Sequence, residues 1–186
     1  DKLTFSAIFQ TNENGDVKQY WLGRTVIHSD HRYTYEDVQQ IIETKEGLHQ
    51  EEILLLNEMA QKLRKKRFSK GAINFSSQEV RFQLDEKGVP IGIVVKESKE
   101  SHQLIEEFML LANRTVAENI AKQHINKKPI PFPYRVHDQP DEEKLAPFIQ
   151  YAKRYGHSFD ISTPQAIAHS FNGMLADAHG KPEQHV

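Results

Sequence analysis

The stretch HQLIEEFMLLANRTVAENIA, residues 102–121, predicts a long amphipathic helix with a wide apolar surface. On a helical wheel its apolar side chains fall on one broad side: Leu104, Ile105, Phe108, Met109, Ala112, Val116 and Ile120. Glu107 falls with Arg114 and Glu118 in the one polar gap, so we expect Glu107 to face solvent. Its neighbour Glu106 falls outside that gap, on surface that should be mostly covered.

A carboxylate on a covered helix face needs a partner or a ligand, because burying an unpaired charge is costly. A structural salt bridge or a hydrogen bond to a neighbouring backbone explains such a position more often than a ligand does. Glu107 needs no special explanation on this pattern, whereas Glu106 is a candidate for either role.

The residues before this helix alternate in a way that predicts hairpins and two more helices. Residues 3–10 predict a strand, and Asn14-Gly15 predicts a hairpin turn into a second strand. Thr34 is the expected N-cap of a helix, with Asp37 placed for a near capping box. Further segments are expected as a helix at about 51–68 and as strands at 72–75, 79–84 and 91–95, with Val80, Phe82 and Leu84 on one strand face.

The residues after it predict a boundary and two helices. Residues 126–134 hold three prolines and suggest an extended internal boundary, followed by a short strand at 134–138. Helices are expected at about 141–156 and 162–178, the second with Pro164 in its first turn, before a frayed tail. The hairpins imply antiparallel pairing, so the fold class is α+β, with antiparallel hairpins packed against several amphipathic helices.

Composition bounds the function only loosely. The chain has 186 residues, 38% of them hydrophobic and 27% charged, and a net charge of −2, so nothing global indicates nucleic acid. The absence of cysteine excludes disulfides and thiolate chemistry and suits a cytoplasmic protein. No apolar run is long enough for a membrane span. The chain starts without a methionine or signal peptide, so we expect a processed protein or an internal piece.

Several polar clusters could carry chemistry, each with an ordinary alternative. His28, Asp30 and His31 could hold a divalent ion, although this spacing is weak evidence. His137-Asp138 resembles a metal phosphohydrolase pair, but such a site needs further ligands, and a role of Asp138 at the start of the helix near Pro140 explains it better. The basic run at residues 64–67 could meet phosphates, but a solvated helix end explains it better. Tyr35 and Phe75 could stack on bases, although core packing explains an aromatic on an apolar face more often.

Five segments, taken in order, are similar to one family. They are LTFSAIF (3–9), RTVIHSDHRYTYEDV (24–38), GAINFSSQEVRF (71–82), HQLIEEFMLLAN (102–113) and YRVHDQPDEEKL (134–145). Their order and spacing resemble the RNB catalytic domain of bacterial ribonuclease II and, more closely, ribonuclease R, which are processive 3′→5′ exoribonucleases. The resemblance covers residues 1–156. It implies that residues 1–128 are the central part of such a domain and that residues 129–186 continue it.

The resemblance also implies roles for three residues. Phe75 would clamp the terminal bases of single-stranded RNA by stacking, and Tyr35 would lie near the RNA path. Glu106, the first acid of the family's IEE motif, would contact the sugar of the 3′-terminal nucleotide, where a carboxylate can accept from the 2′-hydroxyl.

The family's Mg²⁺ ligands, a cluster of aspartates, have no counterpart in this sequence, nor has the segment that supplies an arginine to the scissile phosphate. We therefore expect an internal fragment that has no catalytic residues and no metal of its own and that is inactive alone. The intact enzyme is expected to bind single-stranded RNA, to have no preference for DNA and not to associate with a membrane. The alternative is a non-catalytic RNA-binding or protein-interaction module. The oligomeric state does not follow from the sequence.

Overall fold

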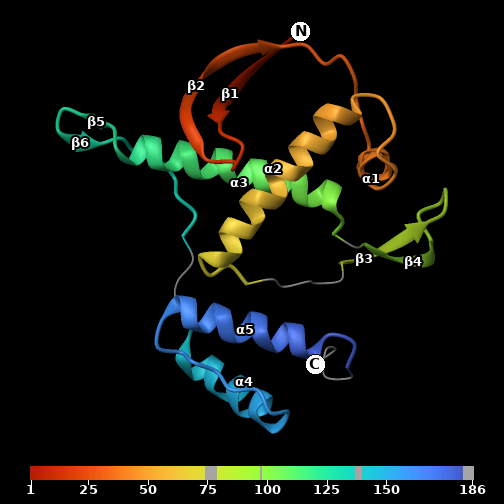
Figure 1. The fold of residues 1–186 in the computed structure, drawn as a ribbon, viewed down its shortest axis with the longest axis vertical. Helices are drawn as coiled ribbons and strands as arrows, with labels where there is room; N and C mark the ends of the chain where they lie inside the picture. Colours follow the sequence, from red (N-terminus) through yellow and green to blue (C-terminus); the bar gives the residue numbers. More distant parts are fainter. Residues whose placement is uncertain (74–78, 97, 137–139, 182–186) are drawn as a thin grey trace. The chain divides into compact units, whose positions relative to one another are not determined.

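The computed structural model describes residues 1–73, 79–96, 98–136 and 140–181, drawn in Figure 1. In chain order the elements are β1 (Lys2–Thr11), β2 (Val17–Ile27), α1 (Tyr35–Thr44), α2 (Gln50–Ser69), β3 (Glu79–Leu84), β4 (Pro90–Lys96), α3 (Glu100–Ala121), β5 (His124–Ile125), β6 (Lys128–Pro129), α4 (Glu142–Arg154) and α5 (Pro164–Ala178). The described residues form two units, one within residues 1–64 and 77–133, the other within 65–76 and 134–186. This mixture of helices and antiparallel hairpins confirms the predicted α+β class.

The first hairpin forms where the sequence predicts it. Strands β1 and β2 pair antiparallel, with Ile8 opposite Trp21. In the connecting turn, the Asn12 side-chain oxygen accepts hydrogen bonds from the backbone N–H groups of Asn14 and Asp16, at 3.1 and 2.8 Å. Gly15 adopts a φ of 74°, which glycine tolerates without a steric penalty. The second predicted hairpin, β3–β4, is also present.

Polar contacts at the turn and at the start of β2 hold the first hairpin against the helices. At its turn, the Lys62 ammonium of α2 donates to the Glu13 carbonyl at 2.7 Å and pairs with Glu58 at 2.6 Å. Further along β2, the Tyr20 hydroxyl accepts from the Asn119 side chain of α3 at 3.1 Å. The hairpin therefore spans between α2 and α3 within the first unit.

Helix α1 begins at the N-cap that the sequence predicts. The Thr34 hydroxyl accepts from the Asp37 backbone N–H at 3.1 Å, and the Asp37 carboxylate accepts from the Thr34 N–H at 3.0 Å, which completes the capping box. The Thr34 backbone N–H, and after it the Thr34 hydroxyl, lower the pKa of Asp37 below its usual value. Ile41 and Ile42 then pack against Ile53 of α2 in the local core.

Helix α1 also packs on α3, and one hydrogen bond joins their polar groups. The Gln39 side-chain oxygen accepts from the backbone N–H of Ser101, in the first turn of α3, at 3.1 Å, and both residues are buried. This bond satisfies one of the backbone donors that a helix start leaves without an intrahelical partner. Because it is buried, it orients α1 relative to the start of α3.

The second unit contains α4 and α5, two helices that the sequence predicts. Asp141 caps α4, and the Thr163 hydroxyl accepts from the Ala166 N–H at 3.1 Å to cap α5, with Pro164 at its first position. Between the helices lies an aromatic cluster with ring centroids 5.0 to 5.5 Å apart, formed by Phe148, Phe159 and Phe171. None of the helices in the described ranges is both long and apolar enough to cross a membrane.

Two expectations about strands were wrong where the structure describes the residues. Residues 134–136 form no strand, and neither do Ala72 and Ile73; the rest of both segments lies outside the described residues. A strand needs a pairing partner, and alternation alone does not supply one. The short β5–β6 hairpin lies within the extended segment expected at 126–134 and just before it. The side chains of Val80, Phe82 and Leu84 on the predicted strand β3 are exposed.

Replacing Thr34 by alanine removes the hydroxyl acceptor of the α1 capping box. We expect Thr34→Ala to lower the free energy of unfolding by about 1 kcal/mol, the usual cost of losing such a cap. Thr115→Ala, which removes a hydroxyl that only donates to the Leu111 carbonyl of its own helix, is the matched control. Urea titration of both variants checks this, and equal losses for the two would contradict the importance of the cap.

Candidate functional site

The two adjacent acids of α3, Glu106 and Glu107, differ in burial, and the difference is the reverse of the predicted one. Glu107 is the buried one, with 3% of its side chain exposed, whereas 40% of the Glu106 side chain is exposed. The prediction that Glu107 faces solvent was therefore wrong, and Glu106 lies at a half-open surface.

The reason is that the neighbouring elements cover different sides of α3 along its length. In its first turns the buried residues are Ser101, Leu104 and Glu107. Further along the side that carries Glu107, Arg114 and Glu118 are exposed, as the wheel predicts. A wheel averages over the whole helix, so it cannot show that the polar side is covered only near the start.

Arg64 of α2 compensates the buried charge of Glu107. Its guanidinium Nη1 lies 3.6 Å from a Glu107 carboxylate oxygen and 3.7 Å from one of Glu106, and only 18% of the Arg64 side chain is exposed. One guanidinium thus lies between two consecutive carboxylates. A second polar contact between the same helices, from the Gln61 amide to the Gln103 side-chain oxygen at 3.4 Å, lies one turn earlier on α2.

Tyr35 lies at the same end of α3. Its ring stacks on His102 with centroids 4.2 Å apart and planes inclined by 11°, and 44% of Tyr35 remains exposed. His102 precedes Glu106 by one helical turn, so the two side chains leave α3 on the same side. The structure therefore brings the two predicted RNA-contacting residues that it describes, Tyr35 and Glu106, to one surface of the first unit.

The imidazole of His102 is fixed by a hydrogen bond to the backbone. Its Nδ1 accepts from the backbone N–H of Lys99 at 3.4 Å, which places the ring over the start of α3. An accepting Nδ1 leaves the proton of a neutral imidazole on Nε2. The flat Tyr35–His102 pair is thus anchored on one helix start and presents an exposed aromatic ring.

The remaining candidates are not brought together. His28 pairs with Asp1 at 3.2 Å and lies 3.9 Å from Asp30, but across the described ranges no three His, Asp or Glu side chains are placed to hold a metal ion. Phe75, His137 and Asp138 lie outside the described residues.

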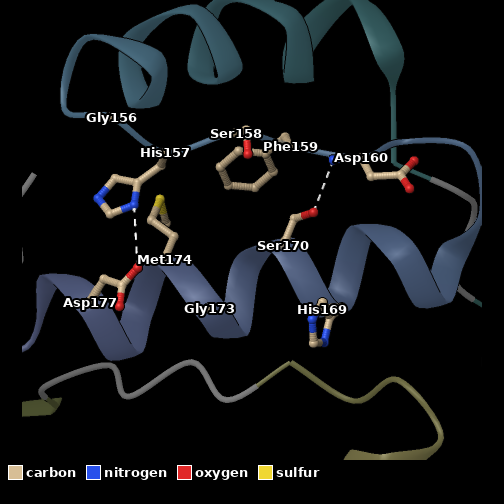
Figure 2. A pocket seen from close by; sticks show the side chains of 10 residues that line it. All are labelled: Gly156, His157, Ser158, Phe159, Asp160, His169, Ser170, Gly173, Met174 and Asp177. Carbon is tan, nitrogen blue, oxygen red and sulfur yellow. Dashed lines mark hydrogen bonds and ion pairs between the residues drawn. The ribbon is translucent and has the colours of Figure 1, made fainter.

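The second unit contains a separate pocket of about 430 Å³, between the loop 156–160 and α5. Figure 2 shows His157 facing Asp177 at one end, 4.0 Å apart, and Ser170 accepting from the Asp160 backbone N–H at the other, at 2.9 Å. The hydroxyl and then the backbone N–H of Ser162 lower the pKa of Asp160. Neither Tyr35 nor Glu106 lines this pocket.

Sequence reasoning missed two residues of the Tyr35–Glu106 surface. His102 had a signal, because it stands one turn before Glu106, and an aromatic ring at that spacing shares its side of the helix. The sequence signal for Arg64 was weak, because Arg64 belongs to a run of basic residues. Nothing in the sequence shows which residue of that run faces α3.

Comparison with known proteins assigns the family. A model of the RNB domain matches residues 1–183, so the chain belongs to the RNB family. DIS3-like exonuclease 2 of Schizosaccharomyces pombe is 38% identical over 183 residues, covering 90% of this chain and 19% of the relative. Ribonuclease R of Chlamydia pneumoniae is 36% identical over 165 residues, covering 87% of this chain and 23% of the relative.

A solved structure supports the fold. The structure of Mycoplasma genitalium ribonuclease R in complex with ribose-methylated single-stranded RNA superposes with a TM-score of 0.82 at 24% identity, covering 98% of this chain and 29% of that protein. The expected RNB membership is thus confirmed, with relatives in both the ribonuclease R and the DIS3-like groups. The chain spans 19 to 29% of the length of these three proteins.

The different environments of the two acids predict different stability effects. Glu107→Ala removes the buried carboxylate that faces the largely buried Arg64, and we expect it to lower the free energy of unfolding by about 3 kcal/mol. Glu106→Ala removes a half-exposed partner and should cost less than about 1 kcal/mol. Chemical denaturation of the two variants measures the difference, and a larger loss for Glu106→Ala would reverse the assignment.

Proposed function

We propose that this chain is part of a processive 3′→5′ exoribonuclease that hydrolyses single-stranded RNA to nucleoside 5′-monophosphates. RNB family membership supports the reaction class. The observation that carries the proposal is local: an exposed aromatic stack and a half-exposed carboxylate, Tyr35–His102 and Glu106, share one surface at the start of α3. Stacking rings and a carboxylate are the groups that contact the bases and sugar of a single strand.

Each residue of this surface has a distinct role in the proposal. Glu106 accepts a hydrogen bond from the 2′-hydroxyl of the terminal ribose, which distinguishes RNA from DNA. Tyr35 stacks along the RNA path, and Phe75 clamps the terminal bases. None of the three performs the hydrolysis, so within this chain we assign substrate-binding residues and no catalytic residue.

The hydrolysis itself is assigned to parts of the enzyme other than this chain. In the family that the sequence resembles, Mg²⁺ held by aspartates assembles the attacking water, and those aspartates have no counterpart here. We propose that residues 1–128 and 129–186 belong to one catalytic domain, that the enzyme is cytoplasmic, and that the isolated chain is inactive.

A second candidate function is a non-catalytic RNA-binding or protein-interaction module. The basic residues at the end of α2, which include the exposed Lys65 and Lys70, favour it. Such a module predicts sub-micromolar, salt-sensitive RNA binding by the isolated chain, because phosphate contacts release counterions. A partial substrate channel predicts weak binding instead.

Glu106→Ala, made in the intact enzyme, tests the assignment of the carboxylate. We expect the preference for a 3′-terminal ribose over a deoxyribose to fall by about tenfold, since a hydrogen bond to a charged group contributes about 1.5–3 kcal/mol. Binding of two oligonucleotides that differ only in the terminal 2′-hydroxyl measures it. Glu118→Ala, on the exposed end of the same helix, is the control. An unchanged preference in Glu106→Ala would refute the role.

Tyr35→Ala and Phe75→Ala test the stacking residues in the same enzyme. Each should weaken binding of a single-stranded oligonucleotide by about 1–3 kcal/mol, the usual contribution of one base–aromatic stack. Phe82→Ala, at an exposed aromatic of β3, is the matched control. Unchanged affinity and unchanged length of the final digestion product would assign the replaced ring to packing alone.

The purified chain itself separates the two candidate functions. We expect no Mg²⁺-dependent shortening of a labelled RNA, and binding too weak to saturate at micromolar protein. Processive shortening would contradict the assignment of the chemistry to other parts of the enzyme. Tight binding that weakens steeply with added salt would favour the RNA-binding module.

A further inference from the structure

We propose that Arg64 is a positioning residue that holds the Glu106 carboxylate in place. Arg64 pairs with Glu106 and, at the same time, with the buried carboxylate of Glu107. The inference rests on the proposed role of Glu106 as the acid that contacts the terminal ribose. It adds that the preference for ribose depends on an arginine that itself lies largely inside the protein, and on an acid that cannot reach the substrate.

The geometry carries the first step. Arg64 comes from α2, whereas both acids come from α3, so the contacts at 3.6 and 3.7 Å join two helices. Arg64 has 18% of its side chain exposed, and the Gln61–Gln103 hydrogen bond lies beside it between the same helices. The guanidinium is therefore confined by packing, and a confined cation fixes the position of whatever it pairs with.

Burial assigns different roles to the two acids. Glu107, at 3% exposed, cannot contact a ligand, but its charge requires a partner inside the protein, which keeps Arg64 in place. Glu106, at 40% exposed, can contact a ligand while it pairs with Arg64. A carboxylate has about four acceptor sites, so an ion pair and a hydroxyl donor can use it together.

The arrangement favours an arginine over a lysine. A guanidinium presents five N–H donors in a rigid planar fork and can serve two carboxylates at once in defined directions. A lysine at the same place keeps the charge but is a point donor on a flexible stem. Replacing Arg64 by lysine should therefore leave a folded protein in which the Glu106 carboxylate is oriented less rigidly.

The test measures the binding ratio for oligonucleotides ending in ribose or deoxyribose, in the intact enzyme. Glu106→Gln should lower this ratio by about tenfold, since a charged acceptor becomes neutral. Arg64→Lys should lower it by at least about threefold, and should add nothing when combined with Glu106→Gln, because both act through one carboxylate. Arg114→Lys, an exposed arginine on α3, should leave the ratio unchanged.

A double variant, Arg64→Met with Glu107→Leu, guards against loss of folding. Neutral replacement of a whole buried ion pair is often tolerated. Glu106 keeps its charge in this variant but loses Arg64, so the ratio should fall while the melting temperature stays close to that of the parent. A purely structural role for Arg64 predicts that any variant that remains folded keeps the parent ratio.

The outcomes separate the two proposals. A ratio that Glu106→Gln lowers but that folded Arg64→Lys and the double variant leave unchanged overturns the positioning role and keeps the proposed function. A ratio unchanged by Glu106→Gln overturns the role of Glu106 and the positioning role with it. A fall in the ratio in both Arg64 variants, absent from Arg114→Lys, is the expected result.

Discussion

The candidate site depends on one ionic contact, the Arg64 guanidinium lying between the consecutive carboxylates of Glu106 and Glu107. It joins α2 to α3 at the buried carboxylate of Glu107, and a buried charge is tolerated in a protein interior only with a partner. The buried hydrogen bond from Ser101 to Gln39 then orients α1 on the same helix start. Tyr35 of α1 consequently meets the surface that carries Glu106.

Two neighbouring acids of one helix thus have unlike roles because their surroundings differ. Burial commits Glu107 to the protein, where it pairs with a cation, while partial exposure leaves Glu106 accessible to a hydroxyl. The proposed preference for ribose then comes from a carboxylate that is already oriented before RNA arrives, and less ordering has to occur on binding. An RNA path formed by flat rings and one oriented acid would be tolerant of base identity and selective for the sugar.

Much of this fold could be predicted from interactions between residues close in the sequence. Most of the wrong predictions concern residues whose surroundings are set by contacts with distant segments. Thr34, Pro164 and Asn14-Gly15 act within a few residues of themselves, so the helix starts and the hairpin turn followed from the sequence. The environment of Glu107 did not, because it is set by α2, a separate segment of the chain. The strand expected at 134–138 does not form over residues 134–136, the part of it that the structure describes. Phe75, predicted from family resemblance, lies outside the residues that the structure describes.

The most direct measurement is a crystal structure of the intact enzyme, in a slow variant outside this chain, with a single-stranded oligoribonucleotide bound. The account predicts a Glu106 carboxylate oxygen within hydrogen-bond distance of the terminal 2′-hydroxyl, with Arg64 still between the two acids and a base or sugar along the exposed ring of Tyr35. A 3′ end bound elsewhere, or Glu106 turned away from Arg64 and from the ribose, would contradict it.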